Sequence, residues 1–235
     1  MEGKFYGVGV GPGDSELLTI KAVNAIKNAD VIIAPKTEKK EGSVALTIAA
    51  PYISDAEIIF QTFPMVKHFE ESKEIFEQNT NQILDFLRAG KNVAFLTLGD
   101  PMFFSTYIYI FNLLKNSGAD IETIAGIPAF LGIASHIGRA AAYGNDIITI
   151  IPATAPKEKI VNALKVSDSA VLMKVYKNFA DVVDMLDAEN MIDDAVLISR
   201  YGLDDEKIIS DIRSHRDDKL NYLSTILTRR GKVED

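Results

Sequence analysis

The first 35 residues constrain the fold most, because they read as strand, helix and strand in succession. Residues 4–10 form a short apolar run with glycine at alternate positions, and residues 17–26 carry apolar side chains at helical spacing. Residues 31–35 form a second apolar strand. Two strands joined through a helix in this way lie parallel, with a right-handed crossover. The chain is therefore predicted to open an α/β fold with a parallel sheet.

Strands and helices continue to alternate along the chain. In the first half, strands are predicted at 57–60, 93–98 and 121–124, and helices at 43–50, 70–88 and 108–114. In the second half, strands are predicted at 147–151 and 170–175, helices at 157–164 and 179–186, and three closing strands at 195–200, 207–210 and 220–228. The closing strands have no helix between them and are predicted to be antiparallel. We therefore expect two α/β lobes, residues 1–124 with a mostly parallel sheet and residues 125–235 with a mixed sheet.

Composition excludes several classes of protein and site. Apolar residues make up 47% and charged residues 25% of the chain, as in soluble globular proteins, and no apolar run is long enough to cross a bilayer. The amino terminus lacks the features of a signal peptide, so a cytoplasmic location is expected. The chain has no cysteine and three widely spaced histidines, so no metal site is expected. A net charge of −8 disfavours nucleic acid as a partner.

The glycine-rich turn at 7–13 does not fit the common nucleotide-binding motifs. The pattern G-x-G-x-x-G fails at Pro12 when counted from Gly7 and at Asp14 when counted from Gly9. The Gly-Lys-Ser/Thr of a phosphate-binding loop is absent. The turn is therefore predicted to let the backbone approach a ligand or another chain segment closely.

A second candidate loop follows the predicted strand at 93–98. The apolar run stops at Gly99-Asp100-Pro101, and a helical pattern resumes after Ser105 and Thr106. Ligands of open α/β sheets bind beyond the carboxyl ends of the strands, which is where this loop would lie. Asp100 would offer an acceptor, and the two hydroxyls would offer donors. The alternative is an ordinary turn in which Ser105 caps the helix.

Several blocks of sequence, taken together, carry a family resemblance. Residues 7–19, 29–32, 98–101 and 126–130 resemble the tetrapyrrole (corrin/porphyrin) methyltransferase family in order and spacing. Within that family, residues 3–14, 63–65, 99–107 and 173–175 resemble the precorrin-2/cobalt-factor II C20-methyltransferases of cobalamin synthesis.

The resemblance implies a homodimer of two-lobed chains, with S-adenosylmethionine in the cleft between the lobes and a tetrapyrrole in an adjacent trough. The implied cofactor-binding residues are Pro12, Leu98, Gly99, Asp100, Phe103, Ser105, Thr106, Pro128, Ala129, Met173, Tyr201, Ser224 and Thr225. The residues predicted to bind the substrate are Met65 and Tyr107, with Lys36, Arg139, Lys174 and Arg200 as cations for its carboxylate rim.

The chain departs from the family pattern at Pro128, where the family usually has Thr or Ser. Proline supplies neither a hydroxyl nor an N–H, so a cofactor hydrogen bond is lost there, and we hypothesise that Ser105 or Thr106 compensates. A base that removes the proton from the methylated carbon could be Asp14, Asp100 or Tyr107. A carboxylate in such a loop can equally be a hydrogen-bonding anchor.

The function predicted from these blocks is methyl transfer from S-adenosylmethionine to C20 of precorrin-2 or cobalt-factor II. One alternative keeps the family and changes the target to another precorrin position or to a non-tetrapyrrole such as a modified histidine on an elongation factor. Another is a non-catalytic nucleotide-binding module. No residue distinguishes the metal-free substrate from its cobalt complex.

Overall fold

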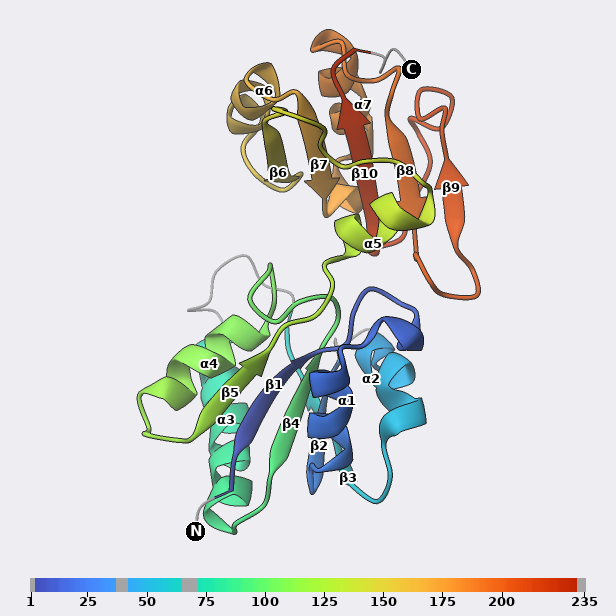
Figure 1. Cartoon of the computed structure of the whole chain (residues 1–235). Helices are drawn as coiled ribbons and strands as arrows, with labels where there is room; N and C mark the ends of the chain where they lie inside the picture. Colours follow the sequence, from blue (N-terminus) through green and yellow to red (C-terminus); the bar gives the residue numbers. More distant parts are fainter. Residues whose placement is uncertain (1–2, 37–41, 65–71, 232–235) are drawn as a thin grey trace. The chain divides into compact units, whose positions relative to one another are not determined.

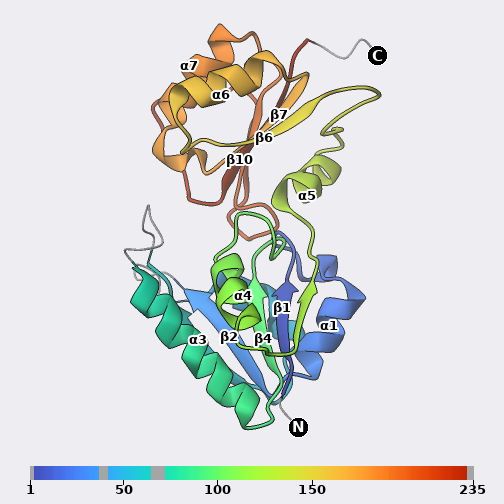
Figure 2. The same cartoon turned by 90° about the vertical axis from the view of Figure 1, so that its left-hand side faces the viewer.

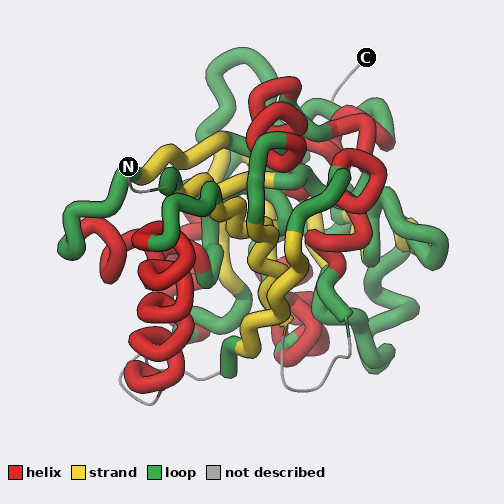
Figure 3. Tube along the Cα trace, turned by 90° about the horizontal axis from the view of Figure 1, so that it is seen from below, coloured by secondary structure: helices red, strands yellow, loops and turns green. Residues whose placement is uncertain are grey.

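The structure is a computed structural model that describes residues 3–36, 42–64 and 72–231 (Figure 1). The chain divides into two compact units, Met1–Pro128 and Ala129–Asp235, where the sequence predicted a boundary after residue 124. Figure 3 marks the helices, strands and loops of both units by colour. Each unit is described by itself below.

The described part of the first unit contains one parallel sheet of five strands in the order β3-β2-β4-β1-β5. Its strands are β1 (Phe5–Gly9), β2 (Val31–Lys36), β3 (Glu57–Thr62), β4 (Val93–Thr97) and β5 (Ile121–Ile124). Its helices are α1 (Ile20–Lys27), α2 (Val44–Ala49), α3 (Lys73–Arg88) and α4 (Tyr107–Lys115), with short 3₁₀ turns at Ser15–Leu17 and Ala50–Tyr52. The predicted parallel sheet is confirmed.

Two helices cover each face of this sheet (Figures 1 and 2). Helices α1 and α2 pack on one face around Ala22, Ile26 and Ile48, whereas α3 and α4 pack on the other face around residues that include Ile83 and Ile110. The chain therefore leaves β1 and β4, which are neighbours in the sheet, toward opposite faces. Such a divergence opens a crevice at the carboxyl ends of the two strands, which is where α/β sheets bind ligands.

The second unit contains a mixed sheet in the order β6-β7-β10-β8-β9 within the described residues. Its strands are β6 (Ile148–Pro152), β7 (Ser169–Met173), β8 (Val196–Ser199), β9 (Lys207–Ile209) and β10 (Ser224–Arg229), and its helices are α5 (Ala129–His136), α6 (Lys157–Lys165) and α7 (Phe179–Ala188), with a 3₁₀ turn at Val175–Lys177. Strands β6 and β7 are parallel, and the other pairs are antiparallel, as predicted.

The last strand begins later than the sequence predicted. The prediction started it at residue 220, whereas β10 begins at Ser224. The Asn221 side chain accepts a hydrogen bond from the Leu223 N–H at 3.0 Å, and the Ser224 hydroxyl donates to the Asn221 carbonyl at 2.8 Å. These local bonds hold a turn in place of the first residues of the strand.

Candidate active site

The loops that follow β1 and β4 are joined to each other by their backbones. The Gly99 N–H donates to the Gly11 carbonyl at 2.8 Å, and the Gly11 N–H donates to the Gly99 carbonyl at 3.3 Å. The two loops that the sequence singled out therefore meet at the crevice between β1 and β4. A ligand in that crevice would face both loops.

Three glycines allow these backbones to come together. A Cβ atom on Gly126 would lie 2.1 Å from the Gly99 carbonyl oxygen, and one on Gly9 would lie 2.5 Å from the Gly126 nitrogen. Gly99 itself has a φ of +72°, which side chains rarely adopt. A Cβ on Gly99 would meet nothing closer than Ile127 O and Pro128 Cα, both at 3.9 Å. A Cβ at Gly99 would thus be only in ordinary contact with Ile127 and Pro128, so the positive φ rather than crowding is what requires glycine here.

The Asp100 carboxylate holds the β4 loop against the segment after β5. One oxygen accepts from the Met102 N–H at 2.8 Å, and the other accepts from the Gly126 N–H at 3.0 Å. Both oxygens are thus engaged with the backbone. This geometry favours the anchoring role over the role of a base.

Pro12 and Asp14 lie in the turn after β1. Pro12 is buried directly after Gly11, whereas Asp14 is exposed. The Asp14 carboxylate accepts from the Glu16 N–H at 2.8 Å and so caps the short 3₁₀ turn that follows. The binding of a cofactor by Pro12 and the removal of a proton by Asp14 stay predictions.

The segment from Leu98 to Thr106 places the other predicted groups of this loop. Leu98 is half-buried, and the rings of Phe103 and Phe104 lie 4.7 Å apart. Phe104 has a φ of +50°, an unusual value for a bulky residue that points to strain in the loop. The Ser105 hydroxyl accepts a hydrogen bond from the Tyr107 N–H at 3.0 Å. This is the helix-capping role that the sequence offered as the alternative to ligand binding. Thr106 begins the helix without a side-chain capping bond.

Tyr107 was predicted to contact substrate or to act as a base, but its side chain is fully buried. Its ring lies 6.1 Å from Phe5 and 5.9 Å from Phe95, and its hydroxyl is 2.6 Å from the Thr123 hydroxyl. Burial raises the pKa of the Tyr107 hydroxyl, which makes it a weaker source of a phenolate. These contacts favour a packing role within the first unit over both predicted roles.

The remaining predicted residues of the first unit, and Ala129 at the start of the second, take no part in the bonds described above where the structure describes them. The Lys36 ammonium lies 5.5 Å from the centre of the Phe60 ring, at the end of β2. Pro128 and Ala129 are half-buried and adjoin the boundary between the units. Met65 falls outside the described residues.

In the second unit, most of the predicted residues gather where the three inner strands of the mixed sheet meet at one end, at the last residues of β7 and β8 and the first residues of β10. Met173 ends β7 opposite Thr225 near the start of β10, and Ser224 faces Ser199 at the end of β8. The side chains of both Ser224 and Thr225 are buried, and the Ser224 hydroxyl lies within hydrogen-bond distance, 3.0 Å, of the Ser199 hydroxyl. Tyr201 follows at the same end, with its ring 5.1 Å from His136.

Two predicted cations follow directly on the strands at that end. Lys174 and Arg200 have φ values of +59° and +57°, so both hold the left-handed conformation. Arg200 forms an ion pair with Asp205, while Lys174 is half-buried, and burial lowers the pKa of its ammonium. Strain at both turns is typical of a site that fixes side-chain direction.

Arg139, the remaining predicted cation, pairs with Asp194 within the second unit. Burial lowers the pKa of the Arg139 guanidinium and raises that of the Asp194 carboxyl, and the pairing opposes both shifts. The guanidinium thus already has an anionic partner, unlike the free cation that the prediction assumed.

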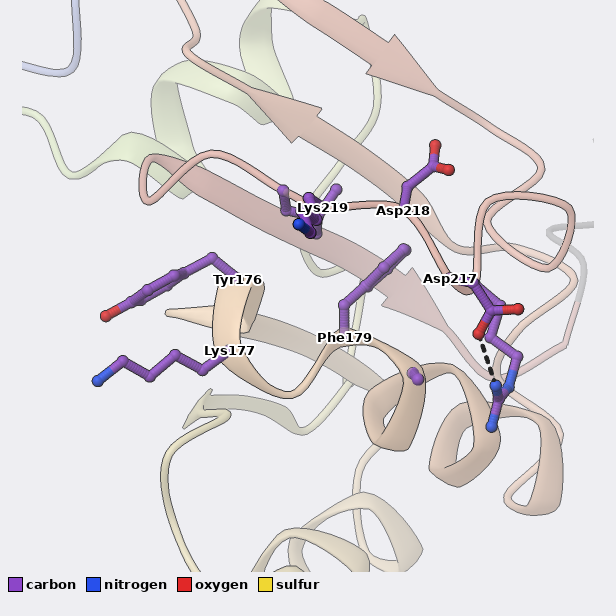
Figure 4. A pocket seen from close by; sticks show the side chains of 9 residues that line it. Tyr176, Lys177, Phe179, Asp217, Asp218 and Lys219 are labelled. Carbon is purple, nitrogen blue, oxygen red and sulfur yellow. Dashed lines mark hydrogen bonds and ion pairs between the residues drawn. The ribbon is translucent and has the colours of Figure 1, made fainter.

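The second unit has a hollow of about 450 Å³, and Figure 4 shows the side chains that line it. Tyr176 and Phe179 lie on one side of it, and the segment that carries Lys219 lies on the other. Arg216, at its margin, is neutralised by Asp217 at 2.9 Å and by Asp184 at 2.7 Å. None of the predicted site residues lines this hollow.

The described residues contain no group of three or more histidine, aspartate and glutamate side chains placed to hold a metal ion. In the same ranges, no helix combines the length and the apolar character that a membrane span requires.

Comparison with known proteins decides the family. Residues 4–214 match the family model of the Tetrapyrrole (Corrin/Porphyrin) Methylases. The chain belongs to this family. The cobalt-precorrin-2 C(20)-methyltransferase of Salmonella typhimurium is 33% identical over 234 residues, or 98% of each chain. A probable cobalt-precorrin-2 C(20)-methyltransferase of Methanocaldococcus jannaschii is 32% identical over 97% of each chain, and the precorrin-2 C(20)-methyltransferase of a Sinorhizobium species is 30% identical over 96% of this chain and 94% of its own.

Solved structures agree on the fold of this tetrapyrrole methylase. A cobalt precorrin-4 methyltransferase superposes with a TM-score of 0.75 at 23% identity, over 96% of this chain and 94% of its own. The uroporphyrin-III C-methyl transferase of Thermus thermophilus, complexed with S-adenyl homocysteine, gives a TM-score of 0.70 at 19% identity, over 96% of this chain and 97% of its own. The predicted two-lobed α/β class is confirmed.

Sequence reasoning missed the structural partners of the predicted residues. Gly126 binds Asp100 and Gly9 packs on Gly126, yet neither glycine was among the predicted site residues. Both stand in the blocks that carried the family resemblance, which was the available signal.

Proposed function

We propose that this tetrapyrrole methylase transfers a methyl group from S-adenosylmethionine to C20 of precorrin-2 or of its cobalt complex in cobalamin biosynthesis. The observation that carries the proposal is the 33% identity to a cobalt-precorrin-2 C(20)-methyltransferase along 98% of both chains. The joined loops after β1 and β4 support it, because a family signature and the crevice of the sheet coincide there.

The turn at Gly99 is the part of the chain proposed to lie against S-adenosylmethionine. Gly99 has no side chain to cover its own backbone, and its left-handed turn is held by the bond to Gly11. We propose that the backbone of Leu98 to Asp100 and the Pro12 turn hold this ligand. When bound, it supplies a methyl group on a sulfonium that is already activated for displacement.

The contribution of the chain to this reaction would then be alignment. Asp100 fixes two loops through two backbone N–H groups, so the surface that they offer is rigid before a ligand arrives. Holding reactants in line can supply on the order of 7–11 kcal/mol of a barrier. No base is assigned, because both Asp100 oxygens are engaged and Tyr107 is buried.

The cations at the edge of the second unit are proposed to bind the carboxylates of the macrocycle. Lys174 and Arg200 follow β7 and β8 in the same strained turn conformation, and Arg200 would exchange its ion pair with Asp205 for one with the substrate carboxylate. Lys36 at the end of β2 offers a third cation in the first unit.

The test is product mass after anaerobic incubation with S-adenosylmethionine and, in parallel, precorrin-2, cobalt-factor II and uroporphyrinogen III. A single added methyl on either of the first two supports the proposal and chooses the route, and NMR then locates the methylated carbon. Methylation of uroporphyrinogen III alone, or of none of the three, refutes the proposed substrate. The third substrate is included because a uroporphyrinogen-III C-methyltransferase of Methanocaldococcus jannaschii is 33% identical over 79% of this chain.

A homodimer and a cytoplasmic location, both expected from the sequence, belong to the same proposal. Light scattering of the purified chain would decide the first, and fractionation of the source cells would decide the second.

A further inference from the structure

Thr97, the last residue of β4, carries a buried hydroxyl without a hydrogen-bond partner. The residue is 7% exposed, and its Oγ1 is one of two partnerless buried side-chain polar atoms in the described part of the chain. The other is the Oε1 of Gln61, whose amide nitrogen is already held by Asn79 and Gln82 at 3.0 Å. Leaving such a group unpaired costs stability, so an orphaned hydroxyl calls for an explanation.

The position of Thr97 in the sheet points to a ligand. Side chains alternate along a strand, so Thr97 shares the face of Phe95, which packs among the residues of α3 and α4. Its partner on β1 is Gly9, which has no side chain. On the other side, the pairing of β2 with β4 ends at Ile33–Phe95 although β4 continues to Thr97.

The loop at the crevice begins immediately after Thr97. Its carbonyl accepts from the Val10 N–H at 2.9 Å, which fixes the backbone between the two joined loops. The hydroxyl is thus a buried side-chain group without a partner at the end of β4, directly before Leu98, Gly99 and Asp100. The buried Thr80 hydroxyl, by contrast, donates to the Phe76 carbonyl at 2.7 Å.

We propose that the Thr97 hydroxyl donates a hydrogen bond to a carboxylate of a bound substrate and is a positioning residue of the crevice. The inference rests on the proposed function, whose two substrates both carry carboxylates: the amino-acid end of the methyl donor and the rim of the tetrapyrrole. A hydroxyl is a suitable donor to such a group, and Lys36 at the end of the neighbouring β2 adds a cation at the same edge of the sheet.

The test compares Thr97→Val, which keeps the shape and removes the hydroxyl, with Thr97→Ser, which keeps the hydroxyl. Thr80→Val is the matched control, because it removes a buried hydroxyl that has an internal partner. In the ligand-free protein, Thr97→Val should leave the Tm unchanged or raise it, whereas Thr80→Val should lower it by about 2–4 °C. A fall in Tm for Thr97→Val equal to that of Thr80→Val overturns the inference, because the hydroxyl then serves the fold.

Binding is measured by calorimetry with S-adenosylhomocysteine and with 5′-methylthioadenosine, which lacks the amino-acid end, and by absorbance titration with the tetrapyrrole. Thr97→Val should weaken one carboxylate ligand about tenfold, and Thr97→Ser should bind it as the wild type does. Loss confined to S-adenosylhomocysteine assigns the bond to the methyl donor, and loss confined to the tetrapyrrole assigns it to the macrocycle.

Unchanged affinities for all three ligands, or equal weakening of both nucleosides, overturn the assignment. These titrations do not depend on turnover. Failure of the wild type to methylate either macrocycle is therefore a separate result, which refutes the proposed function alone.

Discussion

Replacing Gly7 by alanine tests how tightly the Tyr107 ring is packed in the core of the first unit. A Cβ on Gly7 would lie 2.1 Å from Cζ and 2.4 Å from the hydroxyl oxygen of Tyr107, where ordinary contact begins near 3.4 Å. The ring would have to move by more than an ångström. It is fully buried, stacked on Phe5 and bonded to Thr123, so it has no free direction in which to move.

We expect Gly7→Ala to lower the free energy of unfolding by about 2–4 kcal/mol. Overpacking of a dense core costs about 1–3 kcal/mol and more when neighbours cannot shift, which outweighs the roughly 0.5–1 kcal/mol that alanine gains over glycine in a strand. Gly42→Ala is the matched control, since a Cβ there meets nothing within 4 Å and should change stability by less than about 0.5 kcal/mol.

The double mutant with Tyr107→Leu shows whether the clash is the cause. Tyr107→Leu alone should cost about 2–4 kcal/mol through the cavity that it leaves. With the ring gone, the alanine methyl fills part of that cavity, so the double mutant should be no less stable than Tyr107→Leu. Urea unfolding followed by far-ultraviolet circular dichroism measures all four proteins, because the chain has no tryptophan. Additive losses, or a Gly7→Ala protein as stable as the wild type, would refute the reasoning.

Three further outcomes follow from the described contacts. The hydrogen bond from Lys21, together with that from Lys4 at 2.7 Å, lowers the pKa of the Glu122 carboxyl from 4.5 to about 2. The stabilising effect of this carboxylate is therefore complete above pH 4.5 and is lost as pH falls toward 2. The stability difference between wild type and Glu122→Gln in urea should shrink over that range, and a constant difference would contradict the assignment. Asp100→Asn retains one acceptor oxygen for the N–H groups of Met102 and Gly126, so one of the two loops loses its anchor. Calorimetry should then show at least tenfold weaker S-adenosylhomocysteine binding. Lys174→Asn, which suits the left-handed backbone, should raise the KM for the tetrapyrrole severalfold in a steady-state assay and leave the affinity for S-adenosylhomocysteine unchanged.

The fold could be predicted because its signals are local. Apolar runs and helical spacing repeat within a few residues, and they gave the parallel first sheet and the antiparallel closing strands correctly. The start of β10 was placed too early, since an Asn221 side-chain bond to the Leu223 N–H competes there with the sheet. Periodicity carries no information about such a bond.

The candidate site was predictable only as far as its loops. Gly99 and Asp100 were identified from the break after an apolar run, and the structure joins them to Gly11 and Gly126. The burial of Tyr107 was not foreseen, because Tyr107 follows two hydroxyl residues in a loop while its burial depends on Gly7 in a distant strand. The orphaned hydroxyl of Thr97 has no local signature either, because a missing partner is a property of the packed sheet.

The strongest motifs therefore specify how the loops are held rather than which macrocycle is chosen. Asp100 and the glycines contact backbone groups of the same unit, and a fold matching this one at a TM-score of 0.75 belongs to a methyltransferase named for precorrin-4. Backbone anchors of this kind cannot discriminate between macrocycles, so we propose that side chains such as Lys174, directly after β7 in the second sheet, do so. Burial lowers the pKa of the Lys174 ammonium, so its charge is lost at a lower pH than that of an ordinary lysine. The KM for the tetrapyrrole should accordingly rise at alkaline pH in the wild type and stay flatter in Lys174→Asn. Identical pH profiles for the two proteins would remove Lys174 from substrate recognition and leave Arg200 and Lys36 as the cations to test.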